Sequence, residues 1–364
     1  MTLLPPIEPM LASPLGHELP DDLTGLSCEP KWDGFRCLVF RTGPSVLLQG
    51  RGRSRGSSED VVDLAYAFPE LVDECRRQLP DGIVLDAEIV APHDGRLDFG
   101  VLSSRLRPRS EAGGPSIAKL ASEHPATLLA FDLLWHERDL RDEPFSVRRA
   151  ALTSVSEAWT APLLLTPNTV DAHLAWTWFT DFEAAGIDGL MVKRLADPYR
   201  PGVRAQGKVK HLRTADVVVA GWRPHTKPGT DGQAVVGSLL LGLHDESGVL
   251  QYVGVSSAFT AKVRAELVAL LAPLAIGHDD AHPWRGTARG RVPGEANRWK
   301  KEQAWNALRP DLVAEVAYDQ LEVDRFRHVA AFQRWRPDRS PESCDYSQLD
   351  LPPAARIEGL LPLA

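Results

Sequence analysis

The stretch SCEPKWDGFRCLVF, residues 27–40, places a lysine beside a predicted strand. The apolar pattern of residues 35–40 predicts a half-buried β-strand. Pro30 and Gly34 predict a loop at the mouth of that strand, and Lys31 lies within this loop. A lysine in such a position is either an ordinary solvated charge or a nucleophile. The motifs in the rest of the sequence distinguish these two interpretations.

Length and composition indicate a globular protein with two domains. The chain has 364 residues, of which 43% are apolar and 25% are charged. The opening residues, MTLLPPIEPMLASPL, lack a basic segment and are interrupted by prolines, so we expect no signal peptide. Because no run of about 18 apolar residues occurs, we also expect no membrane span and a cytoplasmic location.

The four cysteines have neither metal-binding nor redox spacing. Cys28, Cys37, Cys75 and Cys344 form no C-x-x-C pair. We therefore expect reduced thiols rather than disulfides or a zinc site.

Charge is unevenly distributed along the chain. The net charge of −8 argues against a protein that coats nucleic acid indiscriminately. Residues 199–227 nevertheless hold seven Lys or Arg against one acid, and RGRSR at 51–55 and SRLRPR at 104–109 are two more basic clusters. Such clusters are either solvated loops or local binding sites for a phosphate backbone.

The first part of the chain mixes predicted strands and helices. Residues 108–125 are rich in Pro, Gly and Ser and are predicted to form an exposed loop. Strand patterns cover 35–40, 82–90, 127–135 and 188–195, and helical patterns cover 58–78, 145–158 and 169–185. We expect these elements to form one domain over residues 1–212.

The pattern changes after GKVKHLRTAD, residues 207–216, where β-rich runs dominate. Strands are predicted at 217–222, 234–244, 249–257, 312–323 and 328–335, with one amphipathic helix at 260–274. Short strands with one inserted helix favour a small Greek-key barrel of the OB type over residues 213–340. We place the hinge near 212–215 and expect 341–364 to be a loosely ordered tail.

Residues suited to one kind of chemistry follow one another along the chain. The motif K-x-D-G is too short to be specific by itself, but it is followed by LQGRGRS, LDAEIV, FDLLW, DGLMVK, GKVK and RWRPDR. Together these motifs supply a lysine that attacks, cations that hold a triphosphate, carboxylates that hold a metal, and an aromatic ring that faces a base. This set of residues predicts nucleotidyl transfer.

The predicted nucleophile needs help to lose its proton. A free lysine has a pKa of about 10.4, and lowering it to about 7–8 corresponds to about 4 kcal/mol. Burial, neighbouring cations or a metal supply such an effect. We expect Lys193, Lys208 and Lys210 to provide the cationic field if the fold brings them to Lys31.

In this order the motifs resemble those of the covalent nucleotidyltransferase superfamily, which comprises ATP-dependent DNA ligases, RNA ligases and mRNA-capping guanylyltransferases. The chain is most similar to the short two-domain bacterial ATP-dependent DNA ligases, the ligase C group, especially through EVAYDQLEVDRFRHVAAFQRWRPDR at 315–339. The resemblance spans about residues 5–345. It implies an α+β adenylation domain of antiparallel sheets flanked by helices, followed by a C-terminal OB-fold barrel.

The resemblance also implies a role for each matching residue. Lys31 would carry the AMP, Glu29 would recognise the adenine amino group, and Phe131 would stack on the base. Arg36 and Arg51 would contact the sugar or the nick phosphate, Lys193 would contribute to nucleotide binding, and Lys208 and Lys210 would grip the α-phosphate. Glu88 would bind ribose or metal. Arg336, Asp338 and Arg339 would orient the pyrophosphate when the barrel domain closes over ATP.

One position departs from the family pattern. The fourth motif usually has Glu-Gly, whereas this chain has Asp188 and Gly189. Aspartate is one methylene shorter, so its contact with the expected Mg²⁺ or Mn²⁺ is either indirect or suited to a different ion. Glu88 and Asp188 are the expected metal ligands.

The expected substrate is nicked double-stranded DNA with a 3′-hydroxyl and a 5′-phosphate, sealed in DNA repair by a nucleoid-associated monomer. Expected DNA contacts are Arg51, Arg53, Arg204 and Arg213, and repair proteins such as a primase-polymerase are expected partners. The alternatives are an RNA ligase, a GTP-using capping enzyme, or a non-catalytic nucleic-acid-binding OB protein.

Overall fold

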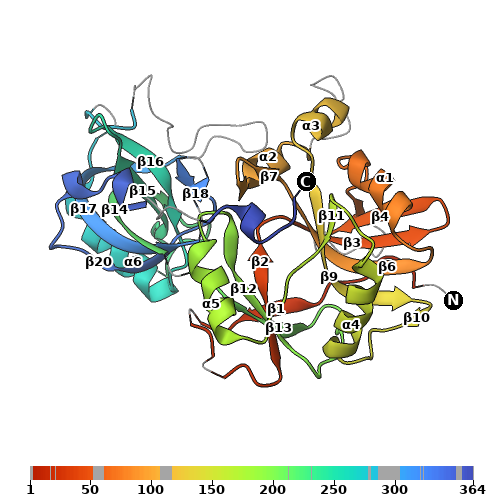
Figure 1. Cartoon of the computed structure of the whole chain (residues 1–364). Coiled ribbons are helices and arrows are strands. Elements are labelled where there is room, and N and C mark those ends of the chain that lie inside the picture. The colour runs from red at the N-terminus through yellow and green to blue at the C-terminus, as the bar shows by residue number, and fades with distance from the viewer. Residues whose placement is uncertain are drawn as a thin grey trace. The chain divides into compact units, whose positions relative to one another are not determined.

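The chain folds into two compact units, which are described separately below. In the computed structural model the described residues are 3–16, 18–20, 22–51, 61–106, 117–211, 213–230, 232–277, 280–285, 304–319, 321–322, 324–349 and 355–363. Unit 1 comprises Met1–His211 with Leu351–Ala364, and unit 2 comprises Leu212–Asp350 (Figure 1). No helix of the described residues is long and apolar enough to cross a membrane.

The first sheet of unit 1 carries the lysine-rich strands. Its order is β1 (Leu11–Pro14), β13 (Arg204–Val209), β12 (Ile187–Arg194) and β2 (Leu26–Trp32). The register pairs Met191 of β12 with Glu29 of β2 on one side and with Lys208 of β13 on the other. Residues that are distant in sequence therefore meet on three adjacent strands.

The second sheet of unit 1 is more deeply buried. Its order is β10 (Arg138–Asp139), β9 (Thr127–His136), β6 (Ile83–Val90), β3 (Phe35–Thr42), β4 (Ser45–Gly50) and β5 (Val62–Asp63), with β11 (Leu163–Leu165) beside β9. Its register places Arg36 of β3 opposite Glu88 of β6. Both sheets are mainly antiparallel, and each has one parallel pair, β1 with β13 and β11 with β9.

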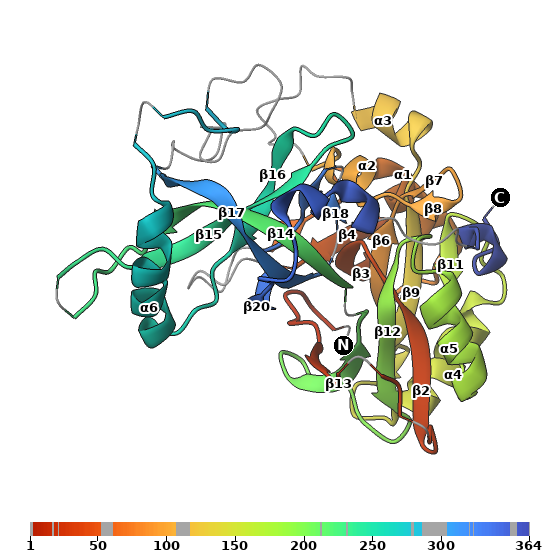
Figure 2. The ribbon, with the colours of Figure 1, turned by 90° about the vertical axis from the view of Figure 1, so that its left-hand side faces the viewer.

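Helices cover the apolar faces of both sheets. They are α1 (Pro69–Gln78), α2 (Phe99–Ser103), α3 (Ile117–Glu123), α4 (Phe145–Ser156) and α5 (Ala172–Asp181), and a short hairpin joins β7 (Pro92–His93) to β8 (Arg96–Leu97). Leu71 of α1 and Leu152 of α4 share one core with the second sheet. Phe179 of α5 shares another core with Leu190 of β12 and Leu129 of β9, so that core joins the two sheets. Figure 2 shows α5 alongside β12 and β2.

Unit 2 is a five-stranded barrel with the topology expected of an OB fold. The strand order is β16 (Leu250–Ser256), β15 (Val236–His244), β14 (Arg213–Pro224), β17 (Asn306–Tyr318) and β20 (Ala331–Trp335). A parallel bridge between Ser256 and Ala330 brings the two edge strands together. The remaining elements are α6 (Ala261–Leu271), the 3₁₀ turn η2 (Ala272–Leu274), and the hairpin of β18 (Leu321–Glu322) and β19 (Arg325–Phe326). The predicted α+β fold class is confirmed.

The C-terminal residues differ from the loosely ordered tail expected over 341–364. The 3₁₀ turns η3 (Pro341–Ser343) and η4 (Tyr346–Leu349) belong to unit 2, where Cys344 and Leu349 join the core. The turn η5 (Ile357–Gly359) instead packs on unit 1, where the Ile357 amide donates to the Gly95 carbonyl at 2.8 Å. Burial of apolar side chains in this short segment outweighs its proline-rich, polar surroundings.

Three local expectations also change. Lys31 lies within β2 rather than in a loop, because β2 continues to Trp32 and a two-residue turn precedes β3. The helix expected over 58–78 begins only at Pro69, and the loop expected over 108–125 contains the helix α3. Gly34 permits the tight turn, since a β-carbon there would lie 2.2 Å from the Ile89 carbonyl oxygen.

Candidate active site

A pocket in unit 1 gathers most of the residues predicted from the sequence. Its volume is about 230 Å³, and it opens beside the first sheet and the strands β3, β6 and β9. The predicted residues in its lining are Glu29, Lys31, Arg36, Arg51, Glu88, Phe131, Lys193, Arg204 and Lys208. The pocket therefore combines cations, two carboxylates and an aromatic ring.

Asp188 holds two lysines at one oxygen. The Lys31 Nζ atom donates to Asp188 Oδ2, and the Lys210 Nζ atom lies 2.8 Å from the same oxygen. Burial acts to raise the pKa of the Asp188 carboxyl, but the Lys31 and Lys210 ammonium groups outweigh it and lower that pKa below its usual value. Asp188 is thus an ionised carboxylate that orients the predicted nucleophile.

The backbone at Gly189 explains how Asp188 comes so close to Lys210. Gly189 has φ +120°, and a β-carbon there would lie 2.1 Å from the Val209 carbonyl oxygen. Only glycine tolerates both conditions. The Asp-Gly pair therefore allows β12 to approach the end of β13, where Lys210 follows Val209.

Glu88 is a carboxylate with too little positive charge around it. It lines the pocket, and burial raises its pKa to about 8, although Lys31 and Arg36 act to lower that pKa. A divalent cation would supply the missing charge. Among the described residues, no group of three or more His, Cys, Asp or Glu could hold a metal ion. A site with one carboxylate, water and phosphate oxygens agrees with how Mg²⁺ is commonly bound.

Arg36 is fixed by two residues that the sequence analysis did not single out. Its Nε and Nη2 atoms donate to the two oxygens of buried Asp86 at 2.9 and 2.6 Å. The Tyr199 hydroxyl donates to Asp86 at 2.7 Å and accepts from the Met10 amide at 3.0 Å. The position of Asp86 two residues before Glu88, in the same strand, is the signal that could have identified it.

Lys193 contacts Glu29 and Phe131 rather than the carboxylate that holds Lys31 and Lys210. Its Nζ atom contacts Glu29 Oε2 at 2.6 Å and donates to the Phe131 carbonyl at 3.2 Å. Arg149, which the sequence analysis missed, lies behind Glu29, with Nη1 3.6 Å from Glu29 Oε1. Both cations are almost fully buried.

Three more predicted cations, Arg51, Arg204 and Lys208, also line the pocket. Burial lowers the pKa of Lys208, and the nearby Lys210 and Lys31 ammonium groups lower it further. Arg204 Nη1 donates to the Ala12 carbonyl at 2.8 Å, and Arg51 is exposed at the pocket lining. Arg53, a predicted DNA contact, lies outside the described residues.

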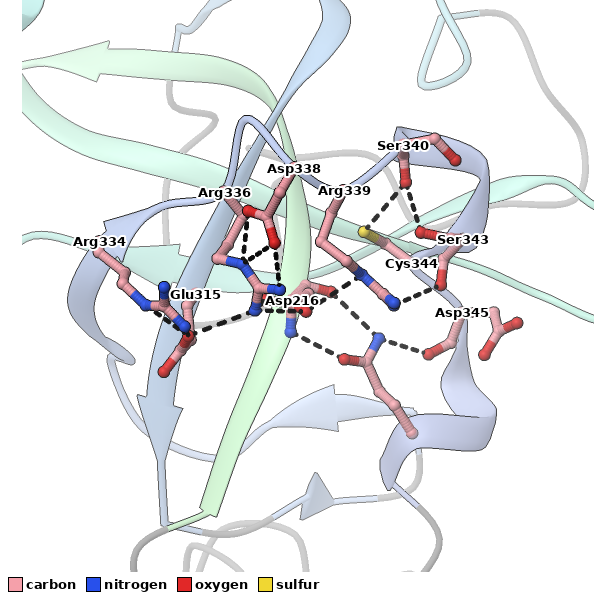
Figure 3. A network of polar contacts seen from close by, with 11 residues as sticks. Asp216, Glu315, Arg334, Arg336, Asp338, Arg339, Ser340, Ser343, Cys344 and Asp345 are labelled. Carbon is pink, nitrogen blue, oxygen red and sulfur yellow. Dashed lines mark hydrogen bonds and ion pairs between the residues drawn. The ribbon is translucent and has the colours of Figure 1, made fainter.

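The C-terminal motif forms a polar network in unit 2 (Figure 3). Arg336 Nη1 contacts both oxygens of Asp216 at 2.9 and 3.0 Å, and Nη2 donates to Asp338 at 2.8 Å. This hydrogen bond lowers the pKa of Asp338 to about 2. Arg339 also pairs with Asp216, at 3.3 Å. The predicted residues Arg336, Asp338 and Arg339 therefore share one ion-pair network.

Arg213, the fourth predicted DNA contact, is engaged within unit 2. It opens β14, and its Nη1 atom donates to the Asp319 carbonyl at 3.1 Å. One donor group of this side chain is thus used inside the protein.

Two protein families match the chain. The ATP dependent DNA ligase domain matches residues 9–211, and the ATP dependent DNA ligase C terminal region matches residues 232–339. The first match covers most of unit 1, including every predicted residue of the pocket, and the second ends at Arg339.

Individual relatives agree with these families. The chain is 44% identical to DNA ligase C2 of Mycolicibacterium smegmatis over 97% of both chains, and 42% identical to DNA ligase C of Mycobacterium tuberculosis over 100% of this chain and 99% of that one. A structure from a study of Lig E DNA ligases has a TM-score of 0.51 and 15% identity, over 89% of this chain and 99% of that chain, and so agrees in fold. The chain belongs to the ATP-dependent DNA ligases.

Proposed function

We propose that this ligase seals nicks with a 3′-hydroxyl and a 5′-phosphate in duplex DNA through AMP bound covalently to Lys31. The observation that carries the proposal is the Lys31 side chain, held by Asp188 at the rim of a cation-lined pocket. Such an arrangement is suited to a phosphoryl transfer in which the protein supplies positioning and charge neutralisation.

The first step forms the lysyl-adenylate. After the Lys31 ammonium loses its proton to water, Nζ attacks the α-phosphorus of ATP, the N–P bond forms, and the bond to the β-phosphate oxygen breaks. Lys210 shares the Asp188 oxygen with Lys31 and adds positive charge beside the reacting groups. Lys208 and Lys210 neutralise charge on the α-phosphate, and pyrophosphate leaves.

The next two steps transfer AMP and close the nick. A 5′-phosphate oxygen attacks the phosphorus of AMP, the bond from that phosphorus to Lys31 Nζ breaks, and the amine takes up a proton from water. The 3′-hydroxyl then attacks the phosphorus of the 5′-phosphate and gives its proton to water, while the bond to the AMP oxygen breaks and AMP leaves. We assign Glu29 and Phe131 to the adenine, and Arg36 and Arg51 to the sugar or the nick phosphate, because all four line one pocket.

A divalent metal fits the pocket at Glu88. Burial raises the pKa of this carboxyl to about 8, and the nearby Lys31 and Arg36 do not offset that effect. Bound Mg²⁺ or Mn²⁺ would neutralise phosphate oxygens. Asp188 was also expected to be a ligand, but its two ammonium partners favour a lysine-orienting role.

The C-terminal motif would act in the first step. Arg336, Asp338 and Arg339 are held in one network, which pre-orients the arginines for an anion. We assign them to the pyrophosphate, which requires unit 2 to close over ATP for adenylation and to move away for DNA.

The proposed DNA contacts are basic side chains, so binding should depend on salt. We assign Arg51, Arg53, Arg204 and Arg213 to the phosphate backbone, and propose that the ligase works as a monomer in DNA repair beside proteins such as a primase-polymerase. A salt titration of binding to nicked duplex measures this electrostatic part; affinity that is independent of salt contradicts it.

Labelling with α-³²P-ATP tests the covalent step. Lys31→Ala should abolish the retained label, whereas the control Lys262→Ala, at an exposed lysine of α6, should keep it. The same assay with GTP, followed by sealing of nicks with DNA or RNA 3′-strands, separates the capping-type and RNA-ligase alternatives. A wild-type protein that acquires neither AMP nor GMP would leave only the non-catalytic binding protein.

A further inference from the structure

The base-binding end of the pocket contains a buried carboxylate with one free oxygen. Glu29 is 2% exposed and lines the pocket from β2. Its Oε2 atom is taken by Lys193, whereas Oε1 accepts no hydrogen bond within the described part of the chain. A buried acceptor without a donor is costly, so Oε1 is suited to a donor that arrives with the ligand.

Two buried cations lie beside this carboxylate without donating a hydrogen bond to Oε1. Lys193 contacts Oε2 at 2.6 Å, and Arg149 Nη1 stays 3.6 Å from Oε1, beyond hydrogen-bond distance. Arg149 instead donates through Nη2 to the Thr166 carbonyl at 2.6 Å. Burial raises the pKa of Glu29, and Lys193 and Arg149 act to lower it. Removing either cation would take away one of the two charges that favour the ionised carboxylate.

The same lysine also fixes the aromatic ring on which the base would stack. Lys193 is 3% exposed, and its Nζ atom lies 4.7 Å from the centre of the Phe131 ring and 4.6 Å from that of Phe145. It donates to the Phe131 carbonyl at 3.2 Å. One ammonium group therefore sets both the acceptor oxygen and the stacking ring.

We infer that Lys193 and Arg149 are positioning residues that make Glu29 select a 6-amino purine, an inference that rests on the proposed use of this pocket for adenine. The 6-amino group of adenine donates to the ionised Oε1. Guanine presents a 6-oxo group there, whose lone pairs oppose the carboxylate. A purine with only hydrogen at C6 leaves Oε1 unpaired.

The inference is tested by comparing ATP with a nucleotide that lacks the 6-amino group. The rate of self-adenylation, as kcat/KM, is measured with ATP and with purine riboside triphosphate, which has hydrogen at C6. Wild type should prefer ATP roughly 10- to 100-fold, as expected for a hydrogen bond to a charged group. Lys193→Met should lose most of this preference, Lys193→Arg should keep most of it, and Arg149→Met should reduce it.

Lys208→Met is the matched control, because it makes the same change at the phosphate end of the pocket. It should slow both nucleotides equally and leave the ratio unchanged. The relative rate with GTP gives a second readout, which should rise in Lys193→Met as Glu29 becomes protonated and able to donate to a 6-oxo group.

The outcomes separate this inference from the proposed function. A wild-type ratio in both Lys193→Met and Arg149→Met overturns the inference, whatever their absolute rates. If a methionine variant folds but does not react, the ratio of its equilibrium affinities for ATP and purine riboside triphosphate decides in the same way. If it does not fold, Lys193→Gln and Arg149→Gln, which also remove the charge, take its place. Failure of wild type to react with ATP would refute the covalent mechanism, while the affinity ratio would still test the role of Glu29.

Discussion

At the level of single residues, Asp188 makes contacts that its family position alone did not predict. Aspartate is one methylene shorter than the usual glutamate, which predicts a metal contact that is either indirect or suited to a different ion. Its oxygen instead binds two lysines that come from β2 and from the end of β13. The shorter side chain suits a carboxylate that orients a nucleophile on a neighbouring strand.

Replacing Asp188 with asparagine tests this role. Asp188→Asn keeps the size of the side chain but removes the charge that fixes Lys31, so the rate of lysyl-adenylate formation should fall by on the order of 100-fold. Single-turnover labelling measures that rate, and the affinity for ATP should change little. The control Asp94→Asn alters an exposed carboxylate and should keep the wild-type rate. A wild-type rate in Asp188→Asn would contradict the orienting role.

The cysteines give a pH-dependent prediction. All four are buried and free, and burial raises the pKa of Cys28 and Cys344 to about 11 and that of Cys75 to about 12. In the native state these thiols stay protonated, while unfolded thiols ionise near pH 8.5. The folded state therefore holds more protons above that pH, and the free energy of unfolding should fall as pH rises from about 8.5 to 11.

Two measurements check the cysteine prediction. At pH 8 the native protein should resist iodoacetamide, and the same four thiols should react after unfolding in guanidinium. The denaturant midpoint should be lower at pH 10 than at pH 8. Rapid alkylation of the native protein would show that these thiols are accessible.

At the level of elements, the site depends on how closely β12 approaches the end of β13. Gly189→Ala should destabilise the protein by about 3 kcal/mol or more, because the new methyl group meets the Val209 carbonyl oxygen and φ is +120°. Gly248→Ala is the control, since φ is +74° there and the space around it is open. It should cost only about 1–2 kcal/mol. Thermal unfolding compares the two, and equal losses would exclude the close approach as the cause.

At the level of the whole molecule, the C-terminal segment returns to unit 1 after the barrel. Ile357 is fully buried beside Phe182 and Leu361 in the core that joins the two sheets. Ile357→Ala should therefore destabilise unit 1 by about 2–5 kcal/mol. Leu4→Ala removes an exposed side chain and should have almost no effect. Thermal unfolding of both variants checks this, and an unchanged midpoint for Ile357→Ala would leave the segment without a stabilising role.

Local sequence patterns predicted most of the strands, and the resemblance carried by the ordered motifs supplied the fold class and the charged residues that line the pocket. Strand patterns at 82–90, 127–135 and 188–195 correspond to β6, β9 and β12 with bounds shifted by at most one residue. Burial on one face of a helix or strand sets the spacing of its apolar residues, so this spacing can be read from the sequence of each segment alone. The order of the short motifs likewise needs no tertiary information.

The pairings inside the site could be decided only by the tertiary structure. Asp188 with two lysines, Lys193 with Glu29, and Asp86 between Arg36 and Tyr199 each join residues that are distant in sequence. The partners in each ion pair depend on the register of neighbouring strands and on how deeply each side chain is buried. These quantities arise when separate elements pack together, so no single segment of the chain contains them.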